Sequence, residues 1–200
     1  MKEILIMPEA SENKRRRSQS KHSAIIESAI ELADVEGYAA TTIERVAAHA
    51  EVGKATIYRW WKSKADLYTE VYQELVPVSE LGRNTGNPQA DLSSLLKAVF
   101  RHYRQTPAGK VLAGLISDSQ LQPSARDALK DNLVAGRKPL LLDILETARS
   151  GGHLAASTDT VLLADALTGL IWRYLLVEPD ALRDDMADRM VDQLVFRGAA

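Results

Sequence analysis

The segment from residue 41 to residue 61 constrains the fold most, because it holds two short helical patterns joined by a very short turn. The string TTIERVAAHA opens with Thr41 and has Glu44 three residues later. This is the pattern of a capping box, whose two side chains accept hydrogen bonds from free backbone N–H groups at a helix start. After the turn EVG, a second segment runs to about Trp61. The short connection between the two segments is typical of a helix-turn-helix.

Two further helices are predicted, one on each side of this unit. From Ser20 onward, apolar residues recur at intervals of three and four, which indicates an amphipathic helix. The residues of this apolar face are Ile25, Ile26, Ala29, Ile30 and Ala33. We expect the helix to stop at Gly37, because glycine commonly follows a helix in the left-handed conformation. On the other side, Ser63 is placed to cap a helix that begins at Lys64.

The rest of the chain predicts more helices and no strands. The Gly/Asn/Pro-rich stretch at 81–92 indicates a loop. Helical patterns then cover residues 91–105, 108–119, 123–150, 159–177 and 180–196. Pro139 lies inside one of these helices and is expected to kink it. The predicted fold class is all-α, with a basic flexible arm at 1–19, a three-helix N-terminal helix-turn-helix domain at 20–66 and a larger helical domain at 67–200.

Composition argues against an enzyme. The chain has no cysteine, which excludes a disulfide framework, a thiol nucleophile and a cysteine zinc site. Its four histidines are scattered and form no HExxH pair, so we expect neither a metal nor a cofactor. No nucleophile and base can be paired from their spacing.

Charge is distributed unevenly along the chain. The formal net charge is -2, yet residues 14–64 hold ten Lys and Arg against six Asp and Glu. The apolar run at the N-terminus is too short and too charged for a signal peptide, so we expect a cytoplasmic protein. The longest apolar stretch, 161–177, contains Asp165 and Arg173. We interpret it as a buried helix rather than a membrane span, which needs roughly 20 apolar residues.

The residues from Ser20 to about Leu75 resemble the TetR family of bacterial transcription regulators. The strings TTIERVAAHA, VGKATIYRWW and KSKADLY are similar to the three DNA-binding segments of that family, in the same order. One departure is Glu51, where the family most often has glycine. If this position is left-handed, glutamate there costs roughly 1 kcal/mol.

The stretch from Val52 to Lys64 divides into a core face and an exposed face. Ile57 and Trp61 are four residues apart, so they share one side of a helix and are expected in the core. The resemblance implies that other positions contact base edges or nearby phosphates, namely Lys54, Thr56, Tyr58 and Arg59. It implies phosphate contacts for Thr42, Trp60 and Lys64. The alternative is that Tyr58 and Trp60 only cover a small core.

The basic run near the N-terminus has two interpretations. Its residues are Lys14, Arg15, Arg16 and Arg17. They can enter the minor groove beside the recognition site, as basic arms do. They can equally form a solvated tail.

The last two helices predict a dimer interface. The first presents Leu162, Ala166, Gly169, Leu170 and Arg173 on one face, and the second carries a stripe that includes Leu182, Met186, Met190 and Leu194. Two copies would form a four-helix bundle. The resemblance implies the same homodimer. The alternative is that both stripes pack within one chain.

The middle helices carry the candidates for a ligand pocket. These are Phe100, Tyr103, Leu115, Leu141, Leu145 and Trp172. The family resemblance implies a cavity among such helices, although apolar residues at helical spacing are more often core. The predicted function is a homodimeric repressor that binds palindromic double-stranded DNA and is released by a small-molecule effector. The alternatives are a DNA-binding dimer that ignores ligands or, less favoured, an enzyme with an accessory helix-turn-helix.

Overall fold

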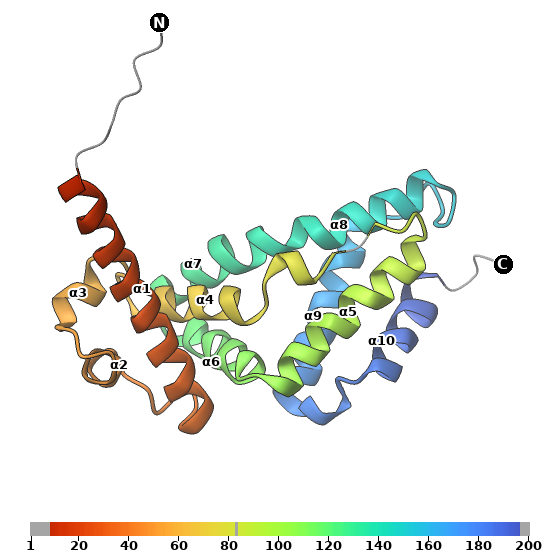
Figure 1. The fold of residues 1–200 in the computed structure, drawn as a ribbon. Helices are drawn as coiled ribbons and strands as arrows, with labels where there is room; N and C mark the ends of the chain where they lie inside the picture. Colours follow the sequence, from red (N-terminus) through yellow and green to blue (C-terminus); the bar gives the residue numbers. More distant parts are fainter. Residues whose placement is uncertain (1–8, 83, 197–200) are drawn as a thin grey trace, which may run out of the picture.

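The computed structural model describes residues 9–82 and 84–196, and every regular element among them is helical (Figure 1). This confirms the all-α prediction. A small N-terminal part contains α1 (Glu9–Val35), α2 (Ile43–His49) and α3 (Lys54–Tyr58), and α4 (Lys64–Leu75) leaves it. The larger part contains η1 (Val78–Glu80), α5 (Pro88–Gln105), α6 (Ala108–Leu121), α7 (Pro123–Ala128), η2 (Leu129–Val134), α8 (Ala135–Ser150), α9 (Thr160–Val177), η3 (Pro179–Ala181), α10 (Asp184–Met190) and η4 (Val191–Val195).

The head, which we define as α1 to α3 with the start of α4, has its own apolar core. Fully buried residues come from all four helices, and they include Ile25, Ala29, Val46, Ile57 and Leu67. The apolar spacing of α1 therefore predicts its buried face correctly. The two helix ends predicted near this core are also confirmed. Gly37 follows α1 with a φ of 81°, and the Ser63 hydroxyl accepts a hydrogen bond from the Asp66 N–H at 3.1 Å.

The start of α2 differs by one residue from the prediction. Thr42, not Thr41, is the N-cap, and its hydroxyl accepts a hydrogen bond from the Arg45 N–H at 3.3 Å. Thr41 is fully buried and its hydroxyl donates to the Gly37 carbonyl at 3.0 Å. Thr41 does not cap the helix because it is buried and its hydroxyl bonds to the preceding turn instead.

The turn between α2 and α3 has the strained geometry expected at Glu51. This residue has a φ of 52°, the one positive value for a non-glycine residue in the described chain. The Val52 N–H donates to the Ala47 carbonyl at 2.9 Å and closes the turn. The tight reversal is therefore retained even though glutamate replaces the favoured glycine.

The basic run lies in a helix. Helix α1 begins at Glu9, so residues 9–19, which we predicted as part of a flexible arm, are helical. Residues 1–8 lie outside the described residues. Lysine, arginine and glutamate have high helix propensity, and the run continues the helix that the apolar face of residues 25–33 establishes.

Helix α4 connects the head to the larger part. It packs against α1 on one side and against α6, α7 and η2 on the other, and Figure 1 shows it running from one part into the other. The predicted domain boundary at 66/67 falls inside this helix. A movement of α4 would therefore be transmitted to both parts.

Tyr38 forms a second connection between the two parts. Its hydroxyl donates to the Asp118 carboxylate on α6 at 2.6 Å. Its ring lies directly on Gly114 of the same helix, where an added Cβ would stand 2.2 Å from the Tyr38 Cδ1 atom. Burial and the neighbouring carboxylate both raise the pKa of Tyr38 far above its usual value, so the hydroxyl stays protonated.

Pro139 lies inside α8, and the helix continues on both sides of it. The α-helical pattern is interrupted before it, by the π-helical segment η2. Proline has no N–H, so the carbonyl of residue 135 lacks its usual helical hydrogen bond. The π-helical segment ends at Val134, directly before that residue.

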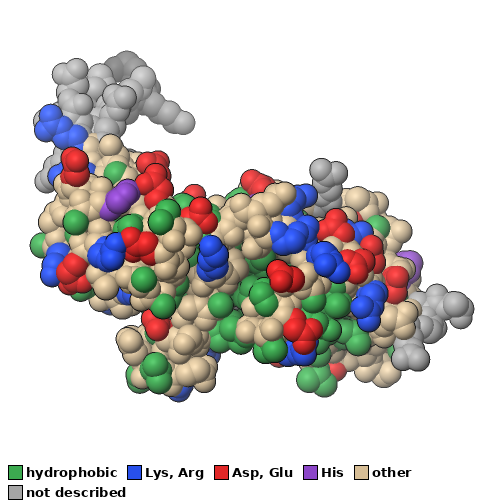
Figure 2. All heavy atoms as spheres, turned by 90° about the horizontal axis from the view of Figure 1, so that it is seen from below, with side chains coloured by type: hydrophobic (Ala, Val, Ile, Leu, Met, Phe, Trp, Pro, Cys, Tyr) green, Lys and Arg blue, Asp and Glu red, His purple; other side chains and the backbone are tan. Residues whose placement is uncertain are grey.

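Helix α9 is less buried than expected. It is long and apolar enough by composition to cross a membrane, but Ala164, Leu167 and Leu175 pack into the core. Only 22% of its residues are buried, so the prediction of a buried helix is wrong for most of it. Figure 2 shows hydrophobic side chains gathered on one face of the larger part. Patches of this kind commonly mark an interface.

Candidate nucleic-acid interface and ligand cavity

Helix α3 presents a short polar face on the outside of the head. Ile57 is fully buried and anchors the helix. Lys54 and Arg59 are exposed, and the Tyr58 side chain is 50% exposed. Thr56 is half-buried. The structure thus places the predicted reading residues on α3 and on its C-cap Arg59, with donors and an aromatic ring facing outward.

The two cations of this face make weak interactions within the chain. The Lys54 ammonium lies 2.8 Å from the Glu44 carboxylate, and both side chains are about half exposed. The Arg59 guanidinium lies 4.8 Å from the centre of the Trp60 ring. Exposed ion pairs contribute little to stability, so Lys54 can exchange Glu44 for a phosphate at small cost.

The two neighbouring tryptophans differ in burial. Trp61 is buried, as its helical position predicts. Trp61 is 4% exposed, and its indole N–H donates to Glu70 at 2.7 Å. Trp60 is half-buried and packs against the head core, so it covers part of that core whether or not it also contacts a phosphate. Its ring lies edge-on to His22 at 5.1 Å and to Trp61 at 5.6 Å. The helical turn continues to Trp61, whose N–H donates to the Ile57 carbonyl at 3.0 Å. Trp60 is partly covered because the His22 and Trp61 rings pack against it.

Lys64, a predicted phosphate contact, is half-buried and packs against Tyr38. Its ammonium donates to the Tyr38 carbonyl at 2.6 Å and lies 3.9 Å from the centre of the Tyr38 ring. Burial lowers the pKa of Lys64. The side chain therefore joins the start of α4 to the turn after α1. A phosphate contact by Lys64 would have to replace or add to these contacts, and it stays a prediction.

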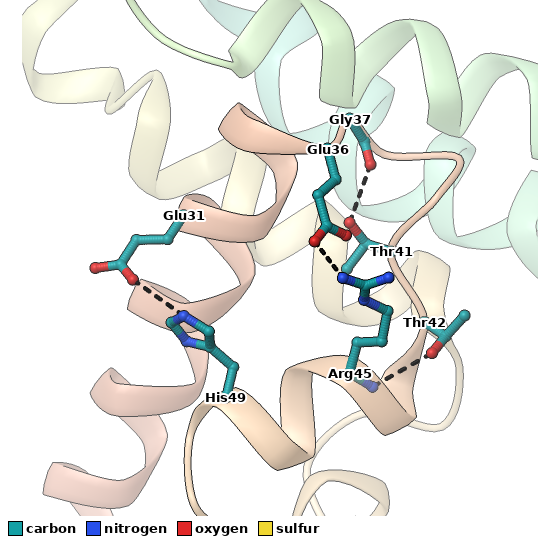
Figure 3. A network of polar contacts seen from close by, with 7 residues as sticks. All are labelled: Glu31, Glu36, Gly37, Thr41, Thr42, Arg45 and His49. Atoms are coloured by element: carbon teal, nitrogen blue, oxygen red, sulfur yellow. Dashed lines mark hydrogen bonds and ion pairs between the residues drawn. The ribbon is translucent and has the colours of Figure 1, made fainter.

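Polar contacts fix α2 against α1 (Figure 3). Arg45 pairs with Glu36, and His49 lies 3.5 Å from Glu31. The Arg45 side chain remains 52% exposed. It lies one turn from Thr42, which is itself exposed. Sequence reasoning missed Arg45 as a candidate for a phosphate contact, although a basic residue in the first turn of this helix was the available signal.

The structure describes the side chain of only one residue of the basic run. Arg17 is exposed on α1. The side chains of Lys14, Arg15 and Arg16 lie outside the described residues, and their proposed place in the minor groove stays a prediction.

A cavity of about 130 Å³ lies among the helices of the larger part. Of the predicted pocket residues, Tyr103, Leu141 and Trp172 line it. Phe100, Leu115 and Leu145 do not line it and are fully buried in the core, so their assignment to a pocket is corrected. All six residues are apolar or aromatic at helical spacing, and only the packing of neighbouring helices separates wall from core.

Polar groups enter this cavity at two places. The hydroxyls of Tyr72 and Tyr103 lie 2.9 Å apart, with the Arg137 guanidinium 4.9 Å from the centre of the Tyr72 ring. The second place is an ion pair of 2.7 Å between Lys138 and Asp165. Sequence reasoning missed Arg137, because the basic pair Arg137 and Lys138 in front of Pro139 carries no pattern that predicts a cavity wall.

The predicted dimer face divides between surface and core. Leu162 is 66% exposed, and the other predicted positions of α9 are exposed or half-buried, namely Ala166, Gly169, Leu170 and Arg173. In α10 and η4, Met186 is half-buried and Leu194 is exposed. Leu182 and Met190 are buried within the chain, so they are corrected to core residues. For these two residues the stripe packs within one chain.

Comparisons with known proteins identify the family. The family model "Bacterial regulatory proteins, tetR family" matches residues 25–71, and the model "Tetracyclin repressor-like, C-terminal domain" matches residues 83–194. The chain belongs to the TetR family of transcriptional regulators. Membership accounts for both parts of the fold, because the two matches cover the head and the larger part separately.

TetR-family relatives span most of the chain. The uncharacterized HTH-type transcriptional regulator Rv1556 of Mycobacterium tuberculosis is 32% identical over 161 residues, which are 80% of this chain and 78% of the relative. The corresponding regulator YdeS of Bacillus subtilis is 26% identical and covers 90% of this chain and 91% of its own length. The crystal structure of the TetR-family regulator SCO0332 is 30% identical with a TM-score of 0.73, covering 88% of this chain and 97% of the other. Their names indicate transcription regulation through DNA binding rather than catalysis.

Proposed function

We propose that this TetR-family chain is a cytoplasmic repressor that binds an inverted-repeat operator as a homodimer and is released by a small molecule. The exposed face of α3 carries the DNA-binding part of this proposal. The fully buried Ile57 anchors this helix in the head. Three exposed side chains of α3 and its C-cap point away from the core, namely those of Lys54, Tyr58 and Arg59. Arginine and lysine are the side chains that most often bind guanine in the major groove.

The exposed apolar residues of α9 support the homodimer. A helix of five residues such as α3 reads too few base pairs for a specific site. Two copies joined through α9 would present two α3 helices and would cover the exposed leucines Leu162 and Leu176. A two-fold dimer of this kind requires a site with matching two-fold symmetry.

Release by a ligand is supported by the contacts of α4. The N-terminal half of the helix is tied to the head, where the Tyr68 hydroxyl donates to the Ala29 carbonyl at 3.2 Å. At the other end, Arg137 donates to the carbonyl of Val76, the C-cap of α4. Tyr72 of α4 lines the cavity. A molecule that displaces Tyr72 or Arg137 would therefore change the position of the head relative to its partner copy.

Footprinting on the DNA upstream of the protein's own coding sequence tests the dimeric operator. We expect protection of two half-sites about one helical turn apart, roughly 34 Å from centre to centre. Random DNA of the same length is the control. A protected site without two-fold symmetry would reject the dimer.

Arg59→Ala tests whether α3 reads bases. If Arg59 contacts a guanine, the variant should bind the operator more weakly by about 1 to 3 kcal/mol and tolerate changes at one base pair. Titration of operator and random DNA with the same protein measures both effects. Arg101→Ala, which removes an exposed arginine from α5, is the matched control and should bind as the parent chain does. Equal losses on both DNAs would move Arg59 to the phosphate contacts.

A further inference from the structure

We infer that the cavity binds a small organic anion, a carboxylate attached to an apolar body of about the size of one aromatic ring. Arg137, with the hydroxyls of Tyr72 and Tyr103, would hold the carboxylate. This inference rests on the proposed release by a ligand and adds the chemical class of that ligand.

The guanidinium of Arg137 is the first observation that favours an anion. Its Nη2 donates to the Val76 carbonyl, whereas Nε and Nη1 are buried and have no hydrogen-bond partner within the described part of the chain. A guanidinium stays charged in proteins, and leaving its donors unpaired in the interior is unfavourable. A carboxylate would supply charge-assisted hydrogen bonds to those donors, which are stronger than bonds between neutral groups.

The tyrosine pair beside it supplies a neutral donor. Burial raises the pKa of Tyr72 and raises that of Tyr103 well above its usual value, so both hydroxyls remain protonated. In their 2.9 Å hydrogen bond one hydroxyl donates to the other. The accepting hydroxyl keeps its own proton, which can be donated to an oxygen of the ligand.

The charged groups of the cavity favour the same sign of ligand. Its lining contains two cations, Arg137 and Lys138, and one carboxylate, Asp165, which leaves a net charge of +1. Asp165 is paired with Lys138 at 2.7 Å and its side chain is 57% exposed. The negative charge therefore lies toward solvent and is already compensated, whereas the charge of Arg137 is not.

The remaining walls set the size and polarity of the body. They are mainly apolar, and include Leu95, Leu96, Val99, Leu141, Ile171 and Trp172. The volume of about 130 Å³ is close to that of an engineered apolar cavity of roughly 150 Å³ that binds benzene. A benzoate-sized molecule combines such a body with the required anion.

Calorimetric titration of the full chain without DNA tests the inference, with benzoate and its neutral isostere benzamide as the probes. We expect benzoate to bind at least tenfold more tightly than benzamide. Arg137→Gln should remove this preference, and Tyr103→Phe should reduce benzoate affinity severalfold while retaining part of the preference. Arg149→Gln is the matched control, because Arg149 lies on the same helix in a surface pair with Glu146 and does not line the cavity. It should bind benzoate as the parent chain does.

Each other outcome overturns the inference. Equal affinity for the two probes, or binding of neither, would mean that the cavity does not select a small carboxylate. A preference that survives Arg137→Gln would remove the guanidinium from the site. If Arg137→Gln does not fold, the comparison of the two probes on the parent chain and on Tyr103→Phe still decides. Because these titrations contain no DNA, their failure is distinct from failure of the footprint, which tests the operator.

Discussion

Trp61→Ala is expected to unfold the DNA-binding head, with a loss of about 3 to 5 kcal/mol in the free energy of unfolding. The Trp61 ring is almost fully buried in a head built from only a few short helices. The substitution leaves a cavity that those helices cannot fill. It also leaves Glu70 without the 2.7 Å hydrogen bond from the indole, next to a His22 that contacts the same carboxylate at 3.1 Å. Circular dichroism melts and operator titration measure the result.

Trp60→Ala is the matched control for this prediction. Trp60 is half-buried and covers the edge of the same core, so its loss should cost less stability than the loss of Trp61. It also removes the ring on which Arg59 lies, and operator affinity should fall while the head remains folded. If Trp60→Ala were less stable than Trp61→Ala, Trp60 rather than Trp61 would be the core residue, which would contradict the structure.

Gly114→Ala is expected to destabilise the chain by about 1 to 3 kcal/mol, the usual cost of overpacking a core. The new Cβ would lie 2.2 Å from a ring atom of Tyr38 and 2.7 Å from its Cβ, so the clash involves the rigid base of that side chain. Tyr38 would have to leave both its hydrogen bond to Asp118 and its position against the Lys64 ammonium. Denaturant titration measures the loss, and the contact between head and larger part should weaken with it.

Gly169→Ala is the control, because this glycine also lies inside a helix. A Cβ there meets nothing within 4 Å in the single chain, and alanine is favoured over glycine in a helix by roughly 1 kcal/mol. The variant should therefore be at least as stable as the parent chain, and any effect on association through α9 is measured separately by sedimentation. Equal stability of Gly114→Ala and the parent chain would show that Tyr38 can move without loss.

The sequence by itself determined the elements whose signals are local. Ser63 caps α4, Gly37 ends α1, and the apolar spacing of Ile57 and Trp61 predicts their burial. Capping and amphipathic spacing act within a few residues, so they can be read without knowing the partner element. Glu51 is different, because only the glycine that the family most often has at this position suggested a left-handed backbone, and the structure shows it with a φ of 52°.

Only the tertiary structure decided the direction of long polar side chains and the division of apolar faces. Lys64 turned inward because the Tyr38 carbonyl and ring, 26 residues earlier, lie within its reach. Arg137 became a cavity residue because α4 ends beside it, and Met190 became core because it is covered by its own chain. Helical spacing gives the face on which a residue lies, whereas the element that covers this face depends on contacts between distant parts of the chain.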